Sequence, residues 1–138
     1  MRNKTIILGC GRLGSSIANE NSLKGEDVIV MDADKSAFVR LDDSFSGITL
    51  VGDATSPEDL EEAGIEDASE VVITTGDDNI NLFLTYLCAK KYAVPHIFVR
   101  FDDPDKGLLV RGMPVRPIYP FSLSRSRYNA YKTGGKEE

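Results

Sequence analysis

The sequence predicts an α/β fold in which six parallel strands form one doubly wound sheet with helices on both faces. Short β-branched apolar runs alternate along the chain with longer segments of helical periodicity. The apolar runs are mostly continuous, which is typical of strands that are covered on both faces. Right-handed crossovers between parallel strands then place the helices on the two sides of the sheet. The 138 residues suit a single domain of this kind.

Six segments have the composition of strands, and five segments between them have the periodicity of helices. The expected strands are Thr5–Leu8, Val28–Met31, Ile48–Val51, Glu70–Thr74, His96–Phe101 and Val115–Ile118. The expected helices are Leu13–Leu23, Lys35–Asp43, Pro57–Ala63, Asn79–Tyr92 and Pro104–Gly112.

Turn and cap residues agree with these boundaries. Gly25 and Gly64 follow expected helices, where a left-handed residue is favoured. Ser56 before Pro57 has the pattern of an N-cap followed by proline in the first turn. Ser56 and Asp59 also have the spacing of a capping box.

The end of the chain differs from the rest. Because proline is disfavoured inside a central strand, the last strand is expected at an edge of the sheet. The prolines that crowd it are Pro114, Pro117 and Pro120. Residues 121–138 carry four basic and two acidic side chains, so their net charge is positive, whereas that of residues 1–120 is negative. We therefore expect the α/β domain to occupy residues 1–120. A linker helix, Ser122–Lys132, and a tail that frays from Thr133 to Gly135 are expected after it.

Charge and cysteine content exclude several classes of protein. Residues 1–120 carry 20 acidic and 12 basic side chains, a net charge of −8. Such a surface repels phosphate backbones, so nucleic-acid binding is not expected. Cys10 and Cys88 lack partners at metal-ligand spacing, so neither a zinc site nor a disulfide framework is expected. The apolar runs are too short for direct membrane insertion, and the start of the chain lacks the features of a signal peptide, which predicts a cytoplasmic protein.

The first strand is followed directly by a glycine motif of Rossmann type. Gly9, Gly11 and Gly14 form G-x-G-x-x-G at the point where the first helix opens. The first glycine permits the tight turn, the second lets a pyrophosphate approach the backbone, and the third lets the helix pack closely on the sheet. Arg12 lies inside this loop, where it is expected to fold over the phosphates; a solvated arginine at the helix start is the alternative.

Asp32 ends the second strand, 18 residues after Gly14. A carboxylate there accepts hydrogen bonds from both ribose hydroxyls of an adenosine and repels a 2′-phosphate. The competing interpretation is a structural glycine turn followed by an ordinary N-cap aspartate. The combination of motif, spacing and alternating strands and helices favours nucleotide binding.

Two further loops are expected at the same edge of the sheet. Asp53 follows the third strand and Thr75 the fourth, and both side chains are placed to bind adenine or ribose. Asp77 or Asp78 is more simply explained as a helix cap. Arg100 ends the fifth strand and reaches either this crevice or an acidic neighbour, Asp102 or Asp103.

The expected helix Asn79–Tyr92 is apolar on most sides. Such a helix is covered on most sides. One side meets the sheet, and the other is covered either by the expected helix Pro104–Gly112 or by a second subunit. The second possibility predicts a homodimer that can assemble further into a ring.

These motifs together resemble the N-terminal domain of the RCK family, also called KTN or TrkA-N domains. The resemblance runs from about Thr5 to Pro120 and rests on short segments in a specific order. They are Gly9–Ser16, Val30–Asp32, Phe38–Phe45, Gly52–Thr55, Leu60–Ile65 and Thr75–Asn79.

The resemblance implies a function. Members of the family are cytosolic regulators of Trk/Ktr-type potassium transporters and of potassium channels. Their Rossmann domains bind NAD(H), ATP, ADP or AMP, and ligand exchange reshapes a ring that gates the membrane pore. Carried over to this chain, the glycine loop and Arg12 hold phosphates, Asp32 the ribose, and Asp53 with Ala54 the adenine. Family members usually continue into a second, smaller domain, whereas this sequence stops after the expected linker helix.

We therefore expect a non-enzymatic, nucleotide-sensing domain that lies at the inner face of the membrane through a transporter or channel partner. The alternative is a fragment of an NAD-dependent oxidoreductase that lacks its substrate domain. No catalytic residue and no metal ligand are predicted. The predicted nucleotide-binding residues are Gly9, Cys10, Gly11, Arg12, Leu13, Gly14, Asp32, Ala33, Asp34, Lys35, Asp53, Ala54, Thr55, Thr75, Gly76, Asp77, Asn79 and Arg100.

Overall fold

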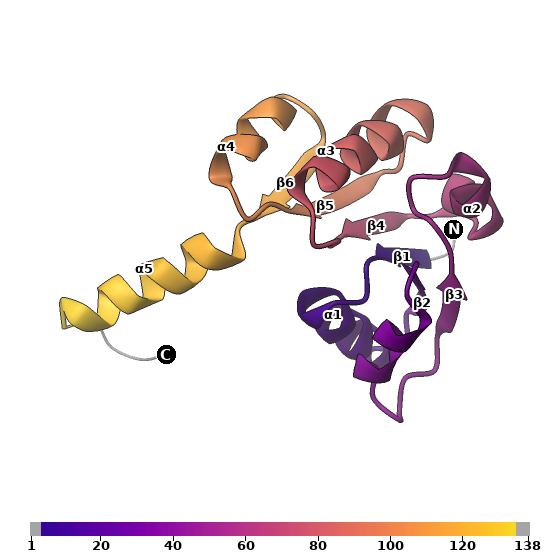
Figure 1. Cartoon of the computed structure of the whole chain (residues 1–138), viewed down its shortest axis with the longest axis horizontal. Helices are drawn as coiled ribbons and strands as arrows, with labels where there is room; N and C mark the ends of the chain where they lie inside the picture. The colour runs from indigo at the N-terminus through magenta and orange to yellow at the C-terminus, as the bar shows by residue number, and fades with distance from the viewer. Residues whose placement is uncertain (1–3, 135–138) are drawn as a thin grey trace.

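Six parallel strands form a single twisted sheet in the order β3-β2-β1-β4-β5-β6 (Figure 1). The computed structural model describes residues 4–134. The strands are β1 (Lys4–Leu8), β2 (Asp27–Asp32), β3 (Ile48–Val51), β4 (Glu70–Ile73), β5 (His96–Arg100) and β6 (Val115–Ile118). The order and the parallel pairing confirm the predicted doubly wound sheet.

Helices cover both faces of this sheet. Those that match predicted segments are α1 (Arg12–Leu23), η1 (Lys35–Arg40), α2 (Pro57–Glu62), α3 (Asp78–Tyr86) with η3 (Leu87–Lys91), and α4 (Pro104–Gly107) with η4 (Leu108–Val110). A short turn, η2 (Ile65–Asp67), and the final helix, α5 (Pro120–Lys132), complete the set.

The alternation of side chains along β1 divides the core into two layers. Ile6 and Leu8 are fully buried in the layer beneath α2 and α3, with Leu84 and Phe101. Ile7 points the other way, into a smaller layer beneath α1 and η1. Because both faces are apolar, β1 is a central strand, as its continuous apolar run predicts.

Two predicted helices change geometry before their expected ends. The segment Lys35–Asp43 is a 3₁₀-helix that stops at Arg40, because the backbone N–H of Asp42 donates to the Asn19 side chain at 2.9 Å instead of continuing the helix. The segment Asn79–Tyr92 turns from α-helix to π-helix at Leu87. There the N–H of Tyr92 bonds to the Leu87 carbonyl at 3.2 Å, five residues back.

The predicted caps are present, with one difference. Gly25 and Gly64 have φ of 81° and 88°, the left-handed conformation expected after a helix. The Ser56 side chain accepts from the N–H of Asp59 at 3.4 Å and caps α2. The Asp59 carboxylate does not return to Ser56, as a capping box requires; it accepts from the N–H of Asp53 at 2.8 Å. Asp59 thus fixes the loop after β3.

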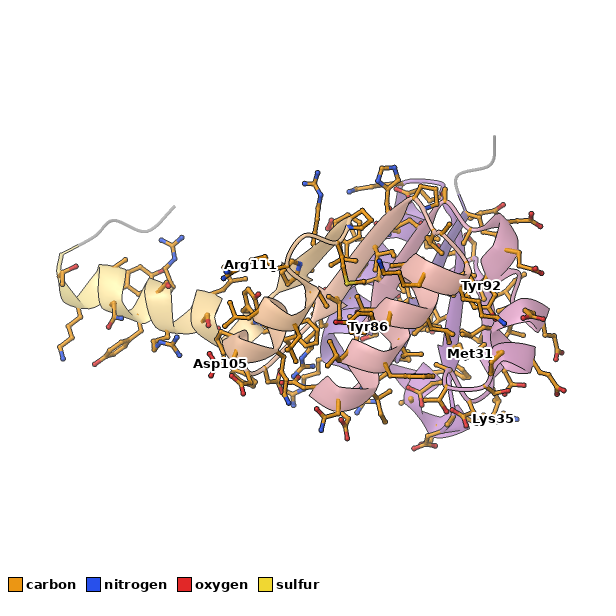
Figure 2. The ribbon with its side chains drawn as sticks, turned by 90° about the horizontal axis from the view of Figure 1, so that it is seen from above. Met31, Lys35, Tyr86, Tyr92, Asp105 and Arg111 are labelled. Atoms are coloured by element: carbon orange, nitrogen blue, oxygen red, sulfur yellow. The ribbon has the colours of Figure 1, made fainter. Side chains whose placement is uncertain are left out.

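The last strand and the last helix follow the expectation for the end of the chain. β6 lies at the edge of the sheet and contains Pro117. α5 begins at Pro120, slightly earlier than expected, and projects from the body in both perpendicular views (Figures 1 and 2). Every side chain of α5 is at least partly exposed. Two residues of the expected frayed tail are described and continue the hydrogen bonding of α5: the N–H of Thr133 donates to the Asn129 carbonyl and that of Gly134 to the Tyr131 carbonyl, both at 3.1 Å. Gly135 lies outside the described residues.

Ala93 has a φ of 50° and therefore occupies the left-handed region without being glycine. We expect Ala93→Gly to raise the free energy of unfolding by about 0.5–1 kcal/mol, because a Cβ is strained in this region. The matched control is Ala89→Gly in the helical segment η3, which is expected to lower it by about 1 kcal/mol. Urea denaturation of both variants checks this, and destabilisation by Ala93→Gly contradicts it.

Candidate functional site

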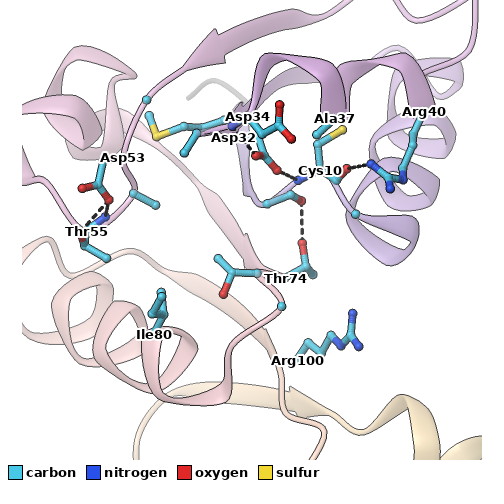
Figure 3. Close-up of a pocket in the computed structure, with 18 residues that line it drawn as sticks. Cys10, Asp32, Asp34, Ala37, Arg40, Asp53, Thr55, Thr74, Ile80 and Arg100 are labelled. Atoms are coloured by element: carbon cyan, nitrogen blue, oxygen red, sulfur yellow. Dashed lines mark hydrogen bonds between the residues drawn. The ribbon is translucent and has the colours of Figure 1, made fainter.

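A cavity of about 410 Å³ opens at the carboxyl edge of the sheet (Figure 3). It is lined by the loops after β1, β2, β3 and β4 and by the end of β5. β1 and β4 lie side by side at the centre of the sheet, where the strand order reverses. Ligands of open α/β sheets bind at this kind of switch point.

The glycine loop closes one side of the cavity and has the geometry that its spacing predicts. Gly9 has a φ of 104°. A Cβ on Gly14 would lie 2.0 Å from the Gly9 carbonyl oxygen, so α1 approaches the loop more closely than any side chain permits. A Cβ on Gly11 would meet no atom within 4 Å. Gly11 therefore leaves open space beside the backbone at the start of α1.

The N-terminus of α1 faces this open space with unpaired donors. Gly11 is the N-cap, and within residues 4–134 no side chain caps the helix. The amide N–H groups of the first turn are thus left for solvent or a ligand. Together with the helix dipole they favour an anionic group.

Asp32 ties the end of β2 to the glycine loop. One carboxylate oxygen accepts from the N–H of Cys10 and the other from the N–H of Asp34, both at 2.8 Å. Each carboxylate oxygen accepts two hydrogen bonds, so one position on each remains for a ribose hydroxyl. The side chain is held in place before any ligand binds.

Two further aspartates are fixed by turns of their own loops. The Asp53 carboxylate accepts from the Thr55 hydroxyl at 2.6 Å and the Thr55 N–H at 2.9 Å, and these bonds lower the pKa of Asp53. Asp34 accepts in the same way from the hydroxyl and N–H of Ser36, which lowers the pKa of Asp34. Both carboxylates are therefore ionised at neutral pH and give this part of the cavity a negative charge.

The structure brings most of the predicted residues to the cavity. Those that line it are Gly9, Cys10, Gly11, Asp32, Ala33, Asp34, Asp53, Ala54, Thr55, Thr75, Gly76 and Arg100. Those outside the lining are Arg12, Leu13, Gly14, Lys35, Asp77 and Asn79. The side chains of Arg12, Lys35 and Asn79 are exposed. Gly14 is buried against the loop, and Asp77 caps α3 through the N–H groups of Asn79 and Ile80.

Several lining residues are absent from the sequence prediction. They are Met31, Ala37, Arg40, Gly52, Thr74 and Ile80. Met31, Gly52 and Thr74 neighbour predicted residues and follow from the strand ends. Arg40 has no sequence signal, because its position depends on where η1 ends. Its guanidinium Nη1 lies 3.5 Å from the Cys10 carbonyl oxygen.

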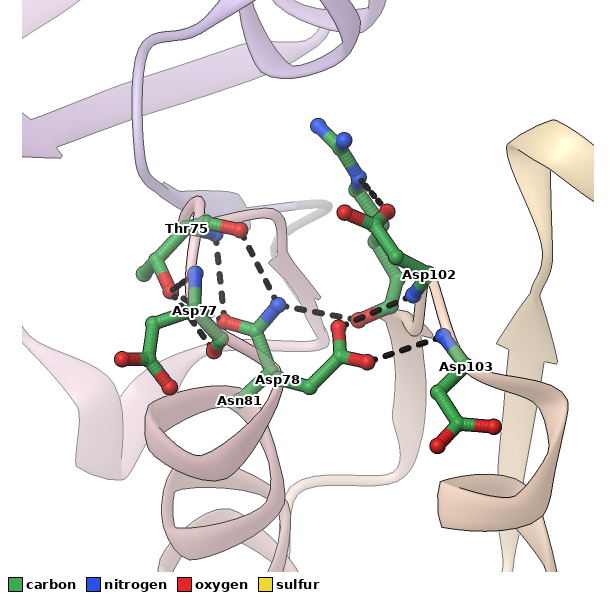
Figure 4. Close-up of polar contacts among 7 residues, drawn as sticks. Thr75, Asp77, Asp78, Asn81, Asp102 and Asp103 are labelled. Atoms are coloured by element: carbon green, nitrogen blue, oxygen red, sulfur yellow. Dashed lines mark hydrogen bonds and ion pairs between the residues drawn. The ribbon is translucent and has the colours of Figure 1, made fainter.

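Asn81, which the sequence analysis also missed, holds two strand ends together (Figure 4). Its fully buried side chain donates to the carbonyls of Thr75 and Arg100 at 3.0 and 2.9 Å. Its oxygen accepts from the N–H of Thr75 at 3.2 Å and from the Thr75 hydroxyl. The loop after β4 and the end of β5 are therefore locked to α3.

Arg100 combines the two placements considered from the sequence. It lines the cavity, and its Nε donates to the Asp102 carboxylate at 2.9 Å. The following loop is held by the Asp78 carboxylate, which accepts from the N–H groups of Asp102 and Asp103, both at 2.9 Å (Figure 4). The backbone around Arg100 is thus fixed on both sides.

The titratable groups of the cavity favour binding over covalent chemistry. Burial, together with the charge of Asp32, raises the pKa of the Cys10 thiol, which makes it a poor nucleophile at neutral pH. Within residues 4–134, no group of three or more His, Cys, Asp or Glu side chains is arranged to hold a metal ion. In the same range, no helix has the length and apolar character needed to cross a membrane.

Comparison with known proteins agrees with this geometry. A family model described as the TrkA-N domain matches residues 5–118. The chain belongs to the TrkA-N domain family. This TrkA-N domain is 34% identical over 102 residues to the Trk system potassium uptake protein TrkA of Streptomyces coelicolor. The match covers 74% of the chain and 46% of that relative, so the chain spans less than half of the relative's length.

Solved structures of the GsuK channel share the fold of this TrkA-N domain. GsuK bound to NAD matches with a TM-score of 0.79 and 27% identity, over 93% of this chain and 23% of that one. GsuK bound to ADP matches with a TM-score of 0.77 and 27% identity, over 93% and 33% of the respective chains.

The second and third glycines of the loop, Gly11 and Gly14, predict mutational effects of different size. Gly14→Ala is expected to lower the free energy of unfolding by about 2–3 kcal/mol, because the added Cβ has no room. Gly11→Ala is expected to change it by less than about 1 kcal/mol, because the φ of −83° and the open space both accept alanine. Thermal and urea denaturation check the pair. Equal losses would show that α1 does not pack as closely as described.

Proposed function

We propose that this TrkA-N domain binds an adenine nucleotide or NAD(H) and regulates a potassium transporter or channel. The observation that carries the proposal is the convergence of an uncapped helix N-terminus, the open backbone at Gly11 and the prearranged Asp32 carboxylate at one cavity. The first two suit a phosphate, and the third suits a ribose diol. Asp53 and Ala54 line the part of the cavity that is left for the adenine.

The similarity to ligand-bound structures supports the choice of ligand class. GsuK was solved with NAD and with ADP, which share an adenosine and a diphosphate. The residues of this chain fit both parts: Asp32 the ribose, and the start of α1 the diphosphate. Bound NAD(H) would supply a redox-active nicotinamide. Among the described residues that line the cavity there is no His or Lys to serve it as acid or base, so a regulatory role is favoured over an oxidoreductase.

The relatives support the proposed partner. The Streptomyces coelicolor relative is a potassium uptake protein, and GsuK is a channel. We infer that this chain acts at the cytoplasmic face of the membrane through a potassium-transporting partner. Affinity purification from native membranes, followed by mass spectrometry, tests this: a potassium transporter or channel subunit is expected, and its consistent absence would contradict the partner.

The Asp32 carboxylate is expected to select a free 2′-hydroxyl. NADH should bind more tightly than NADPH, because a 2′-phosphate meets a like charge and removes a hydrogen bond. Asp32→Ala should weaken the binding of NADH by about tenfold or more. It should also narrow the difference in affinity between NADH and NADPH. Calorimetric titration of both dinucleotides against both proteins measures this. Tighter binding of NADPH to the wild type would overturn the role of Asp32.

We also propose a homodimer, through an apolar patch formed by α3 and η4. Ile80, Phe83 and Tyr86 of α3 are 37%, 47% and 40% exposed, and Leu108 and Leu109 of η4 are 56% and 54% exposed. The segment Pro104–Gly112 covers part of α3, which is one of the two explanations considered from the sequence: η4 packs on α3, and the Tyr86 hydroxyl donates to the Leu109 carbonyl at 2.6 Å. The patch that remains is of the kind that interfaces cover.

Burial decides which residue of α3 can test this dimer. Leu84 is fully buried in the core, so a charge there would unfold the domain, whereas the neighbouring Phe83 lies in the exposed patch. Phe83→Glu is expected to convert the dimer to monomer without loss of stability. Leu23→Glu, at a 70% exposed leucine of α1, is the control and should remain dimeric. A wild-type monomer at high concentration in sedimentation velocity would contradict the proposal.

A further inference from the structure

The cavity has two arginines, one from each half of the sheet. Arg40 ends η1, beyond β2, and Arg100 ends β5. In Figure 3 both lie toward the side of the cavity that is opposite Asp53. The Asp34 carboxylate lies nearer to Arg40: hydrogen bonds from Ser36 and, less strongly, the charge of Arg40 lower the pKa of Asp34. The two guanidinium groups suit an anion.

Arg40 is held in this structure by a partner that a ligand can replace. Its Nη1 donates to the neutral carbonyl of Cys10 at 3.5 Å, the limit of a hydrogen bond. This is one of five donors of the guanidinium. The same residue, Cys10, donates its N–H to Asp32. The glycine loop is thus contacted by the ribose-facing carboxylate on one side and by Arg40 on the other.

Arg100 has the same combination of fixed backbone and available donors. Asn81 binds its carbonyl at 2.9 Å, so the base of the side chain does not move. Its Nε contacts Asp102, and the two terminal nitrogens carry four further N–H donors. The Asp102 carboxylate is partly exposed, at 38%, and exposed ion pairs contribute little to stability. A phosphate oxygen can therefore take its place.

Resting on the nucleotide site proposed above, we propose that Arg40 and Arg100 form a clamp on the phosphate chain of the ligand. Arg12, which the sequence suggested for this role, lies outside the cavity lining, whereas Arg40 is part of it; both side chains are exposed. The clamp spans the switch point of the sheet, so a diphosphate bound between the arginines links the β1–β3 half to the β4–β6 half. The site then distinguishes ligands by the length of their phosphate chain.

Calorimetric titration with ADP, AMP and adenosine tests the clamp. Arg40→Ala and Arg100→Ala are each expected to lower the affinity for ADP by about tenfold and that for AMP by about threefold or less. The affinity for adenosine is expected to change hardly at all. Arg116→Ala is the control, at an exposed arginine on β6 outside the cavity lining; it should retain wild-type affinity for all three ligands. Arg12→Ala tests the competing assignment of the phosphate chain to the arginine of the glycine loop.

Asp102→Asn gives a readout that a merely structural role of Arg100 would not produce. This change releases the guanidinium from its ion pair, so ADP is expected to bind about two- to threefold more tightly, and adenosine is expected to be unchanged. Equal losses for ADP and adenosine in the arginine variants would overturn the clamp, as would an ADP-specific loss in Arg12→Ala with none in Arg40→Ala. Binding of none of the three ligands by the wild type would overturn the nucleotide site itself, and the clamp with it.

Discussion

The close contact between the start of α1 and the loop after β1 is the constraint on which the rest of the structure depends. The Gly9 carbonyl occupies the place where any side chain at position 14 would lie, and it also accepts from the Thr74 hydroxyl at 2.9 Å. One carbonyl therefore sets the distance of α1 from the sheet and joins β1 to β4. Because β1 and β4 flank the switch point, the same contact determines where the cavity opens and which backbone donors face it.

The cavity follows from this constraint through a small number of hydrogen bonds that involve the backbone. Asp32 is oriented by the N–H groups of Cys10 and Asp34, Asp53 by Thr55, and the Thr75 loop by Asn81. These bonds are made without a ligand, so little ordering is required when one binds. Prearranged polar groups at a cavity between two halves of a sheet are well suited to the nucleotide binding that we propose.

The strands, the edge position of the last one and the glycine loop could be predicted because each depends on local patterns: continuous apolar runs, prolines, glycine spacing and caps. Features that depend on distant partners could not. At the early end of η1, Asp42 bonds to the Asn19 side chain, which lies on another helix, and no local pattern places Arg40 at the cavity. Asn81 and Leu84 lie on a helix that is apolar on most sides, where periodicity does not tell the buried face from the exposed one.

The prolines of β6 have a consequence for how subunits can associate. A strand at the edge of a sheet normally offers a row of unpaired groups that recruits a further strand from another molecule. Pro117 interrupts that row, since it has no N–H, and Pro114 and Pro120 flank the strand. This edge of the sheet therefore does not readily pair with a strand of another molecule. Self-association on this side of the molecule then uses its helical surfaces.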